Sequence, residues 1–396
     1  MNKPLSRKTN LGNFPPSKYK DLCMMLNDGD AWKDLACVIL NRRKSGPRFS
    51  TDDVHHFERK ADPADQLLRS WRADSVTLGD LISALDAAKL RRLSDFVCQI
   101  VEPFLVAYES LAVWTHDFDR KSPQDGGNFL GEGGFSEVFK GFHPAKNCWV
   151  AVKRMNTDDA SAADVKTRTE KEIQLLSRCC HKNLLSLLGY SSDGPACCLI
   201  YEYMAQASLE DRLACRNNSL ALTVSQRIII MQDAVSGVAY LHKNGIIHRD
   251  IKSANILLDD EFRAKLGDYG ISRIGPQSSE TTETSAIIGT TVYMAPEYLM
   301  MGTVSYKIDS FSFGVVLLEV LTGLPALDEG REEISLVSHI QENYAGNIDG
   351  IIDAKATNWL SESYTSVYSM SERLLSDTAL RPDILEIVDE IQSWSA

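Results

Sequence analysis

The stretch His248-Arg249-Asp250-Ile251-Lys252-Ser253-Ala254-Asn255 decides how this 396-residue chain is interpreted. It sets a carboxylate, Asp250, five residues before an amide, Asn255, with Lys252 between them. The spacing is that of the loop H-R-D-x-x-x-x-N, in which the aspartate accepts the proton of a substrate hydroxyl and the asparagine holds a magnesium ion. Such a loop requires a glycine loop and a strand lysine upstream, and a second metal-binding aspartate downstream.

A glycine-rich segment stands upstream, at Gly131-Glu132-Gly133-Gly134-Phe135-Ser136-Glu137-Val138. Glycines let the backbone approach phosphate oxygens without obstruction by side chains. Ser136 replaces the third glycine of G-x-G-x-x-G, and Gly134 could supply the lost flexibility. A strand-like run follows the loop instead of a helix, which argues against a dinucleotide-binding motif.

The strand lysine is expected at the end of Val150-Ala151-Val152-Lys153, where it would bind the α- and β-phosphates. Its partner should be a glutamate on the next helix, expected over about residues 164–178. Glu170 and Glu172 compete for this role, and they lie about 200° apart on a helix, so that only one can face the lysine. Glu172 is preferred because it precedes Ile173 and shares a face with two leucines.

The second metal-binding aspartate is predicted in Asp268-Tyr269-Gly270, 18 residues after Asp250. There Asp268 would hold magnesium that bridges the β- and γ-phosphates, and tyrosine keeps the aromatic ring usual at the next position. Ala295-Pro296-Glu297 closes the segment that follows. Asp309 is expected to support the catalytic loop, and Glu297 is expected to pair with Arg381; these are structural roles.

Between these motifs lies a stretch rich in hydroxyls, residues 277–285. A phosphate there adds about −1.5 to −2 charges and can recruit arginines that order a loop. Arg249 and Arg273 could pair with it, although most Ser/Thr-rich stretches are simply polar loops. The candidate phosphosites are Thr281, Thr282, Thr284 and Ser285.

Composition narrows the functional class. The net charge of −12 argues against nucleic acid as the main partner. Residues 1–101 carry 17 Lys+Arg and 13 Asp+Glu, and the remainder carries 25 against 41, which indicates two units with different electrostatic roles. Nine cysteines without a C-x-x-C pair predict reduced, buried thiols. No apolar leader is visible, and the longest apolar run, 311–320, is too short to span a bilayer, so a cytoplasmic protein without membrane insertion is expected.

The first hundred residues predict short amphipathic helices. One begins after Thr77, with Asp80 in its first turn, and carries the stripe Leu78, Leu81, Ile82, Leu85. Others are expected from Pro63, around Trp32 and over Leu90 to Val97. We therefore expect an all-helical bundle over 1–101, a short connection and extension over 102–125, and strands followed by helices over 126–396, an α+β arrangement of two lobes.

Residues 126–396 resemble protein kinases throughout. Lys252, two residues after Asp250, and Gly289-Thr290 are similar to serine/threonine kinases rather than tyrosine kinases. The chain further resembles the interleukin-1 receptor-associated kinase (Pelle-like) family in segments 189–194, 248–258, 289–297, 312–319 and 321–329. Tyr201, at the position called the gatekeeper, is a mark of that family. Ser136, Tyr269 and the near absence of a long linker depart from its pattern.

The resemblance implies a six-helix death domain before the kinase fold. The residues that indicate this domain most clearly are Trp32-Lys33-x-Leu35-Ala36 and Leu67-Leu68-x-x-Trp71. It implies ATP and Mg²⁺ as cofactors, with ATP bound between the lobes. Catalytic roles fall on Asp250, Lys252, Asn255, Lys153 and Glu172, and the metal would be held by Asn255 and Asp268. The nucleotide would contact Leu130, Gly131, Glu132, Gly133, Gly134, Phe135, Ser136, Val138, Ala151, Lys153, Tyr201, Glu202, Tyr203, Met204, Leu257 and Asp268.

The expected function is a serine/threonine kinase recruited by its death domain to adaptors of Toll or interleukin-1-type receptors, with trans-phosphorylation on clustering. Its partners would be those adaptors, protein substrates and further copies of itself. The basic patch Arg42-Arg43-Lys44, with Arg48, could meet an acidic partner surface, or could be a solvated loop. Two alternatives are a scaffold whose kinase lobe acts by assembly, and an N-terminal bundle that only inhibits the kinase.

Overall fold

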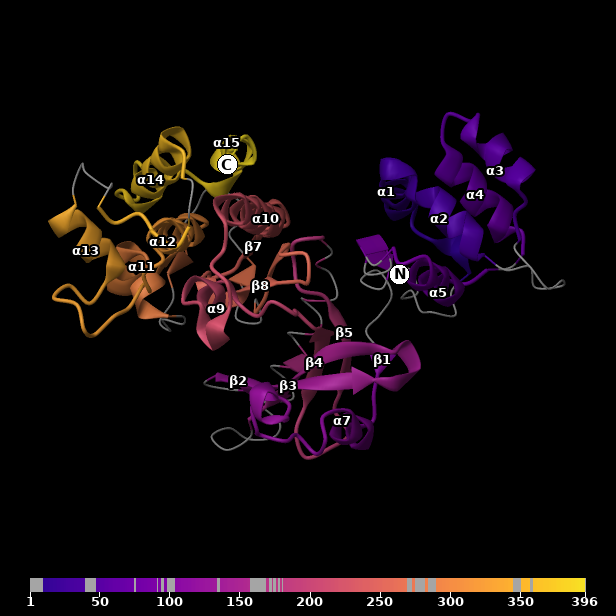
Figure 1. Cartoon of the computed structure of the whole chain (residues 1–396), viewed down its shortest axis with the longest axis horizontal. Coiled ribbons are helices and arrows are strands. Elements are labelled where there is room, and N and C mark those ends of the chain that lie inside the picture. Colours follow the sequence, from indigo (N-terminus) through magenta and orange to yellow (C-terminus); the bar gives the residue numbers. More distant parts are fainter. Residues whose placement is uncertain are drawn as a thin grey trace. The chain divides into compact units, whose positions relative to one another are not determined.

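The computed structural model describes residues 10–39, 48–74, 76–90, 92–93, 96–97, 104–133, 136–156, 169–170, 173, 176, 179, 181–268, 273–274, 282–283, 290–344, 350–356 and 359–395. The chain divides into two compact units, Met1–Cys180 with Ser186–Glu202, and His181–Leu185 with Tyr203–Ala396. The first contains a helical bundle and a β-sheet, each with its own core, and the second is mainly helical (Figure 1).

Among the described residues, the N-terminal bundle contains five complete α-helices: α1 (Pro16–Asn27), α2 (Ala31–Val38), α3 (Thr51–Glu58), α4 (Pro63–Arg72) and α5 (Leu78–Ala87). Their starts are locally encoded. Thr77 and Asp80 exchange side-chain and backbone hydrogen bonds at the start of α5, and Asp62 caps α4 ahead of Pro63. The helices predicted around Trp32, from Pro63 and after Thr77 are thus confirmed.

One apolar core holds these helices together. Trp32, Leu67 and Leu81 are almost fully buried in it, as the amphipathic patterns predict. The helix predicted over Leu90 to Val97 lies partly outside the described residues, but Leu93 and Val97 are buried in the same core. The bundle therefore has its own apolar core, distinct from the core of the sheet.

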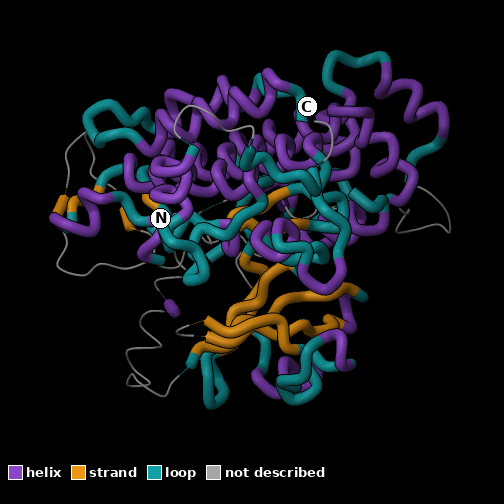
Figure 2. The backbone as a smooth tube through the Cα atoms, turned by 60° about the vertical axis from the view of Figure 1, so that its left-hand side comes forward, coloured by secondary structure: helices purple, strands orange, loops and turns teal. Residues whose placement is uncertain are grey.

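The sheet of the first unit has the strand order β1-β5-β6-β4-β3-β2 among the described residues. Figure 2 shows its strands side by side. β1 runs parallel to β5, and the other neighbours are antiparallel. Helix α7 (Tyr108–Trp114) packs near β3, over a core that includes Phe118, Phe139 and Ile200. The strands are β1 (Phe104–Leu105), β2 (Phe129–Gly133), β3 (Ser136–His143), β4 (Cys148–Met155), β5 (Leu187–Ser191) and β6 (Cys198–Glu202).

The second unit is organised around α12 (Lys307–Thr322), which is buried from Ile308 to Thr322. A helix that is apolar on every side must lie inside a core. Gly314 permits close packing against α14, since a Cβ there would lie 2.9 Å from that of Leu374. The remaining helices are α9 (Leu209–Leu213), α10 (Val224–Lys243), α11 (Pro296–Met301), α13 (Leu336–Asn343), α14 (Ser361–Leu375) and α15 (Ile384–Gln392).

The described part of the second unit also contains short pairs of antiparallel strands. β8 (Ile256–Leu258) pairs with β9 (Ala264–Leu266), and β7 (Ile246–Ile247) pairs with β10 (Arg273–Ile274). β11 (Thr282–Glu283) pairs with β12 (Thr303–Val304). The predicted ion pair of Glu297 and Arg381 is confirmed, at 2.5 Å and buried. Strands in the first unit and helices in the second confirm the predicted α+β arrangement.

The seven described cysteines are all free thiols. The prediction of buried thiols is correct for Cys23, Cys179 and Cys198 but wrong for Cys37, which is exposed. Burial raises the pKa of Cys23 and Cys198 to about 12, so both are unreactive. Within the described part of the chain, no helix is both long and apolar enough to cross a membrane.

Candidate active site

Both carboxylate oxygens of Asp250 are engaged. Oδ2 lies 2.8 Å from Lys252 Nζ and accepts a hydrogen bond of 3.0 Å from Asn255 Nδ2. Oδ1 accepts hydrogen bonds of 3.2 Å from both the backbone N–H and the hydroxyl of Thr290. Lys252 Nζ also donates to Thr290 Oγ1, at 2.9 Å. The three predicted catalytic-loop residues are thus brought together, and Thr290 is tied to them.

Asp309 on α12 holds the backbone of this loop. Its carboxylate accepts hydrogen bonds from the N–H groups of His248 and Arg249, at 2.8 and 2.9 Å, and contacts His242 Nε2 at 2.8 Å. Burial alone would raise the pKa of Asp309, but hydrogen bonding and charge from His242 keep it below its ordinary value. The expected supporting role of Asp309 is confirmed.

His248 links the loop to the segment that carries Asp268. Its Nε2 lies 3.1 Å from the carbonyl oxygen of Gly267, and its Nδ1 accepts from the N–H of Asp250 at 3.2 Å. Burial lowers the pKa of His248. Because Nδ1 accepts a hydrogen bond and Nε2 faces a carbonyl, these contacts fit a neutral ring with its proton on Nε2. The histidine of the motif is therefore a structural cross-link.

Two predicted magnesium ligands lie at the ends of the paired strands β8 and β9. Asn255 directly precedes β8, and Asp268 follows β9 by two residues. The N–H of Gly267 donates to the carbonyl of Asn255 at 2.8 Å, which holds the two ends together. Because Asn255 uses Nδ2 toward Asp250, its amide oxygen is the atom suited to a hard cation, as is the carboxylate of Asp268.

These two ligands alone would not enclose a metal ion. Among the described residues, no group of three or more His, Cys, Asp or Glu side chains could hold one. Mg²⁺ ordinarily keeps few protein ligands and takes the rest from phosphate and water. The donor set therefore fits magnesium that arrives with a nucleotide.

Two non-glycine residues of this site have left-handed backbone conformations, Arg249 with φ 74° and Asp268 with φ 55°. Such conformations are costly and persist only where the surroundings impose them. Arg249 Nη2 donates a hydrogen bond to the hydroxyl of Tyr298 at 2.5 Å, a contact that was not predicted. Its proposed pairing with a phosphate stays a prediction.

In the first unit, the glycine loop is the hairpin between β2 and β3. Gly133 pairs with Ser136, and Gly131 pairs with Val138. Within the described part of the chain, a Cβ at Gly131 would meet no atom within 4 Å, and one at Gly133 would meet only Ser136, at 3.8 Å or more. Packing against the described residues therefore does not demand these glycines, which fits their use for close approach of a phosphate group. Gly134 and Phe135 lie outside the described residues.

The other residues predicted to contact nucleotide are divided between the strands of the first unit and two segments of the second unit. Lys153 on β4 pairs with Val138 and Leu199, and Ala151 pairs with Tyr201 on β6. Tyr201 and Met204 are buried, and Glu202 accepts from the N–H of Ser186 at 3.0 Å. Glu132 and Leu130 lie on β2, Leu257 lies on β8, and Tyr203 is half-buried.

Several predicted residues lie outside the described part of the chain. These include Glu172, the preferred partner of Lys153, whereas its competitor Glu170 is described as helical and exposed. Tyr269, Thr281, Thr284 and Ser285 are also outside it. The backbone of Thr282 pairs with Val304. The choice of Glu172 and the four phosphosites remain predictions.

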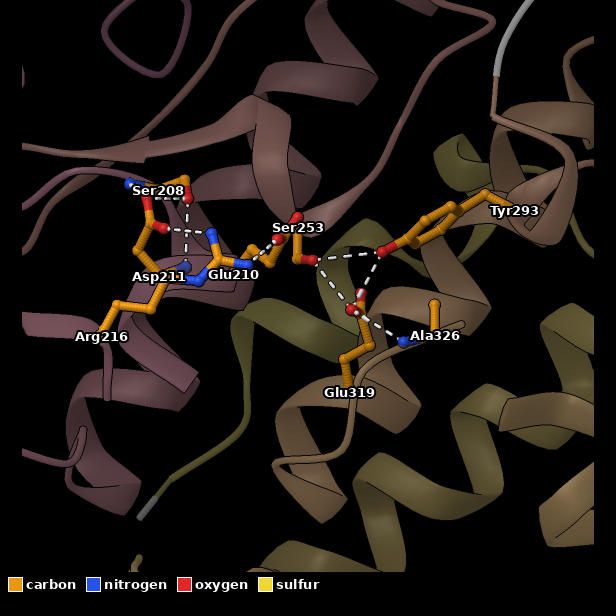
Figure 3. A network of polar contacts seen from close by, with 8 residues as sticks. All are labelled: Ser208, Glu210, Asp211, Arg216, Ser253, Tyr293, Glu319 and Ala326. Carbon is orange, nitrogen blue, oxygen red and sulfur yellow. Dashed lines mark hydrogen bonds and ion pairs between the residues drawn. The ribbon is translucent and has the colours of Figure 1, made fainter. Parts of the chain in front are cut away.

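A buried network beneath the catalytic loop was not predicted (Figure 3). Glu319 of α12 accepts hydrogen bonds of 2.9 Å from both Ser253 Oγ and Tyr293 OH, whose oxygens lie 3.2 Å apart. The N–H of Ala326 also donates to Glu319, at 3.4 Å. The network joins the catalytic loop, α12 and the segment after Thr290. The one sequence signal was the charge of Glu319 inside an apolar run.

Glu319 should make stability depend on pH. Burial raises its pKa from 4.5 to about 8, so folding favours the protonated acid. Its stabilising contribution is complete below pH 4.5 and is lost as the pH rises through about 8. We expect Glu319→Gln to remove this part of the decline in melting temperature between about pH 5 and 8. Melting curves across this range test it, with the exposed Glu329→Gln as control; parallel profiles for wild type and Glu319→Gln would refute it.

Comparison with known proteins agrees with this geometry. The family model described as protein kinase domain matches residues 125–390. A probable leucine-rich-repeat receptor-like serine/threonine-protein kinase of Arabidopsis thaliana is 38% identical over 295 residues, 72% of this chain and 31% of that protein. The probable serine/threonine-protein kinase PBL28 of the same plant is 34% identical over 278 residues, 67% of this chain and 73% of that protein.

A third relative is the Pelle-like serine/threonine-protein kinase pik-1 of Caenorhabditis elegans, 40% identical over 228 residues, 54% of this chain and 47% of that protein. The chain thus spans from about a third to about three quarters of these relatives. It belongs to the protein kinase family, and it is a serine/threonine protein kinase.

Proposed function

We propose that this chain transfers the γ-phosphate of ATP to serine and threonine side chains of proteins. The observation that carries the proposal is the closed set of contacts among Asp250, Lys252, Asn255 and Thr290. These contacts hold a carboxylate beside a cation and beside the amide that we propose as a metal ligand, an arrangement that suits phosphoryl transfer.

In the proposed mechanism, Asp250 orients the substrate hydroxyl and receives its proton. Lys252, 2.8 Å from Asp250, would offset charge on the transferring phosphoryl group. Asn255 and Asp268 would hold magnesium, which when bound neutralises charge on the β- and γ-phosphates. The glycines of the β2–β3 hairpin and Lys153 would hold the phosphates of the same nucleotide, as their order in the sequence implies.

We further propose that residues 1–101 are a death domain that recruits the kinase to adaptors of Toll or interleukin-1-type receptors. A helical bundle with its own apolar core, placed before a kinase domain with a Pelle-like relative, supports this. Part of the proposed basic surface is already engaged, since Arg48 pairs with Asp74 at 2.7 Å and lies over Phe49. Arg42, Arg43 and Lys44 lie outside the described residues.

One experiment tests both proposals. The purified full-length chain is mixed with candidate death-domain adaptors, and the size of the complex and Mg-ATP-dependent phosphorylation are measured together. We expect a large complex, formed equally by the Asp250→Asn chain, and phosphorylation only with wild type. A chain that phosphorylates but stays monomeric with every adaptor contradicts recruitment alone, and a complex without phosphorylation favours a scaffold.

A further inference from the structure

The segment just before the kinase domain, residues 104–121, is folded onto the sheet. It lies outside residues 125–390, which the family model matches. β1 pairs with β5, and α7 begins where the N–H of Tyr108 donates to Asp193 at 3.0 Å. This segment, here called the extension, therefore contributes contacts that the kinase family model does not include.

After α7 the extension passes through a turn of three successive left-handed residues, His116, Asp117 and Phe118, with φ of 50°, 56° and 56°. None is glycine, so the turn is strained and must be imposed by its surroundings. Thr115 holds it: its hydroxyl accepts from the N–H of Phe118 at 3.2 Å, and its carbonyl accepts from Asn128 Nδ2 at 3.0 Å.

The turn fixes the next residues against the sheet. The buried ring of Phe118 meets Phe139 edge to face, with ring centroids 5.2 Å apart, and the guanidinium of Arg154 lies 4.7 Å from its centroid. The N–H of Phe129, at the start of β2, donates to the carbonyl of Lys121 at 2.9 Å. Arg120 is thereby held beside the strands of the glycine hairpin.

The hairpin presents Arg120 with two carboxylates. Glu132 and Glu137 lie directly opposite each other on β2 and β3. Like charges in such a cross-strand pair repel. Arg120 Nη2 lies 3.3 Å from Glu132 and 2.5 Å from Glu137, and Arg154 also pairs with Glu137, at 2.5 Å. The side chain of Glu137 is 7% exposed, whereas that of Arg120 is 63% exposed.

We propose that Arg120 is a positioning residue for the phosphate-binding hairpin, which it holds in register by bridging Glu132 and Glu137. Glu132 stands between Gly131 and Gly133, so an uncompensated carboxylate there would repel the triphosphate of ATP. Arg120 offsets that charge and draws it toward the extension. The inference rests on the proposed function, because it assumes that the hairpin holds ATP.

The test compares the full-length Arg120→Ala, Arg120→Lys and Arg120→Glu chains with wild type. We expect Arg120→Ala to raise KM for ATP about two- to fivefold, as befits a partly exposed ion pair, with kcat within about a factor of two. Arg120→Glu should raise KM further, and Arg120→Lys should stay near wild type. Adding Glu132→Gln to Arg120→Ala should recover much of the lost affinity. Arg373→Ala, which breaks an exposed pair with Glu390 in the second unit, should leave KM unchanged.

Calorimetric binding of Mg-ATP to the Asp250→Asn chain, with and without Arg120→Ala, provides a readout independent of catalysis. The inference is supported if Arg120→Ala raises the dissociation constant for Mg-ATP by the same two- to fivefold factor, even where the wild-type chain shows no phosphate transfer. An unchanged dissociation constant overturns it. The inference is also overturned if Arg120→Ala lowers both kcat and the melting temperature and the added Glu132→Gln restores neither. That pattern would mark Arg120 as a merely structural residue.

Discussion

Replacing Asp250 with asparagine is expected to lower kcat by about 10²–10⁴-fold, the usual contribution of a positioned general base. The amide cannot receive the proton of the substrate hydroxyl. Both carboxylate oxygens of Asp250 are surrounded by donors, namely Lys252, Asn255 and Thr290. The NH₂ group of an asparagine side chain would therefore face another donor. Binding of Mg-ATP should change by less than about threefold, because Asp250 is not among the predicted phosphate or metal ligands. Steady-state kinetics and calorimetry measure the two quantities separately.

Asp377→Asn serves as the matched control, because Asp377 is an exposed aspartate of the second unit. It should leave both kcat and nucleotide binding unchanged. An Asp250→Asn chain with undiminished kcat would refute the assignment of the catalytic loop. A chain that loses ATP binding as well would show that Asp250 acts on the fold of the site and not on the proton.

Asp309→Ala is expected to destabilise the second unit by about 3–5 kcal/mol, the usual cost of breaking a buried charge network. The substitution leaves the N–H groups of His248 and Arg249, and Nε2 of His242, without their buried acceptor. Because these hydrogen bonds hold the backbone of the catalytic loop in place, kcat should fall together with the free energy of unfolding. Amide hydrogen exchange at His248 and Arg249 reports the loss locally, and urea unfolding reports it globally.

The pH dependence of this contribution has a definite sign. The pKa of Asp309 is lower in the folded chain than its ordinary 3.8, so its stabilising effect is present above that value and is lost as the pH falls below it. Asp377→Ala is the control and should change neither exchange nor unfolding. Unchanged exchange at His248 and Arg249 in Asp309→Ala would contradict the supporting role of Asp309.

Much of the site could be predicted because its residues are close in sequence and fixed in spacing. Asp250, Lys252 and Asn255 lie in one loop, and their mutual contacts follow once that loop is recognised. Asp309 and the pair of Glu297 with Arg381 were predictable from their places after the loop, and the helices of the bundle from periodicity and caps.

The rest could not be predicted, for two physical reasons. The contacts of Glu319 with Ser253 and Tyr293, and of Arg249 with Tyr298, join residues far apart in sequence, and such pairings leave no periodic trace. The turn at His116, Asp117 and Phe118 has a left-handed backbone but contains no glycine that would indicate it in the sequence. Tertiary contacts impose this conformation.

The most direct test of the central claim is transfer of the γ-phosphate of radiolabelled ATP to a generic protein substrate, followed by identification of the phosphorylated amino acid. We expect Mg²⁺-dependent label on serine and threonine with the wild-type chain and almost none with Asp250→Asn. Label on tyrosine alone, no transfer by wild type, or equal transfer by the Asp250→Asn chain would contradict it.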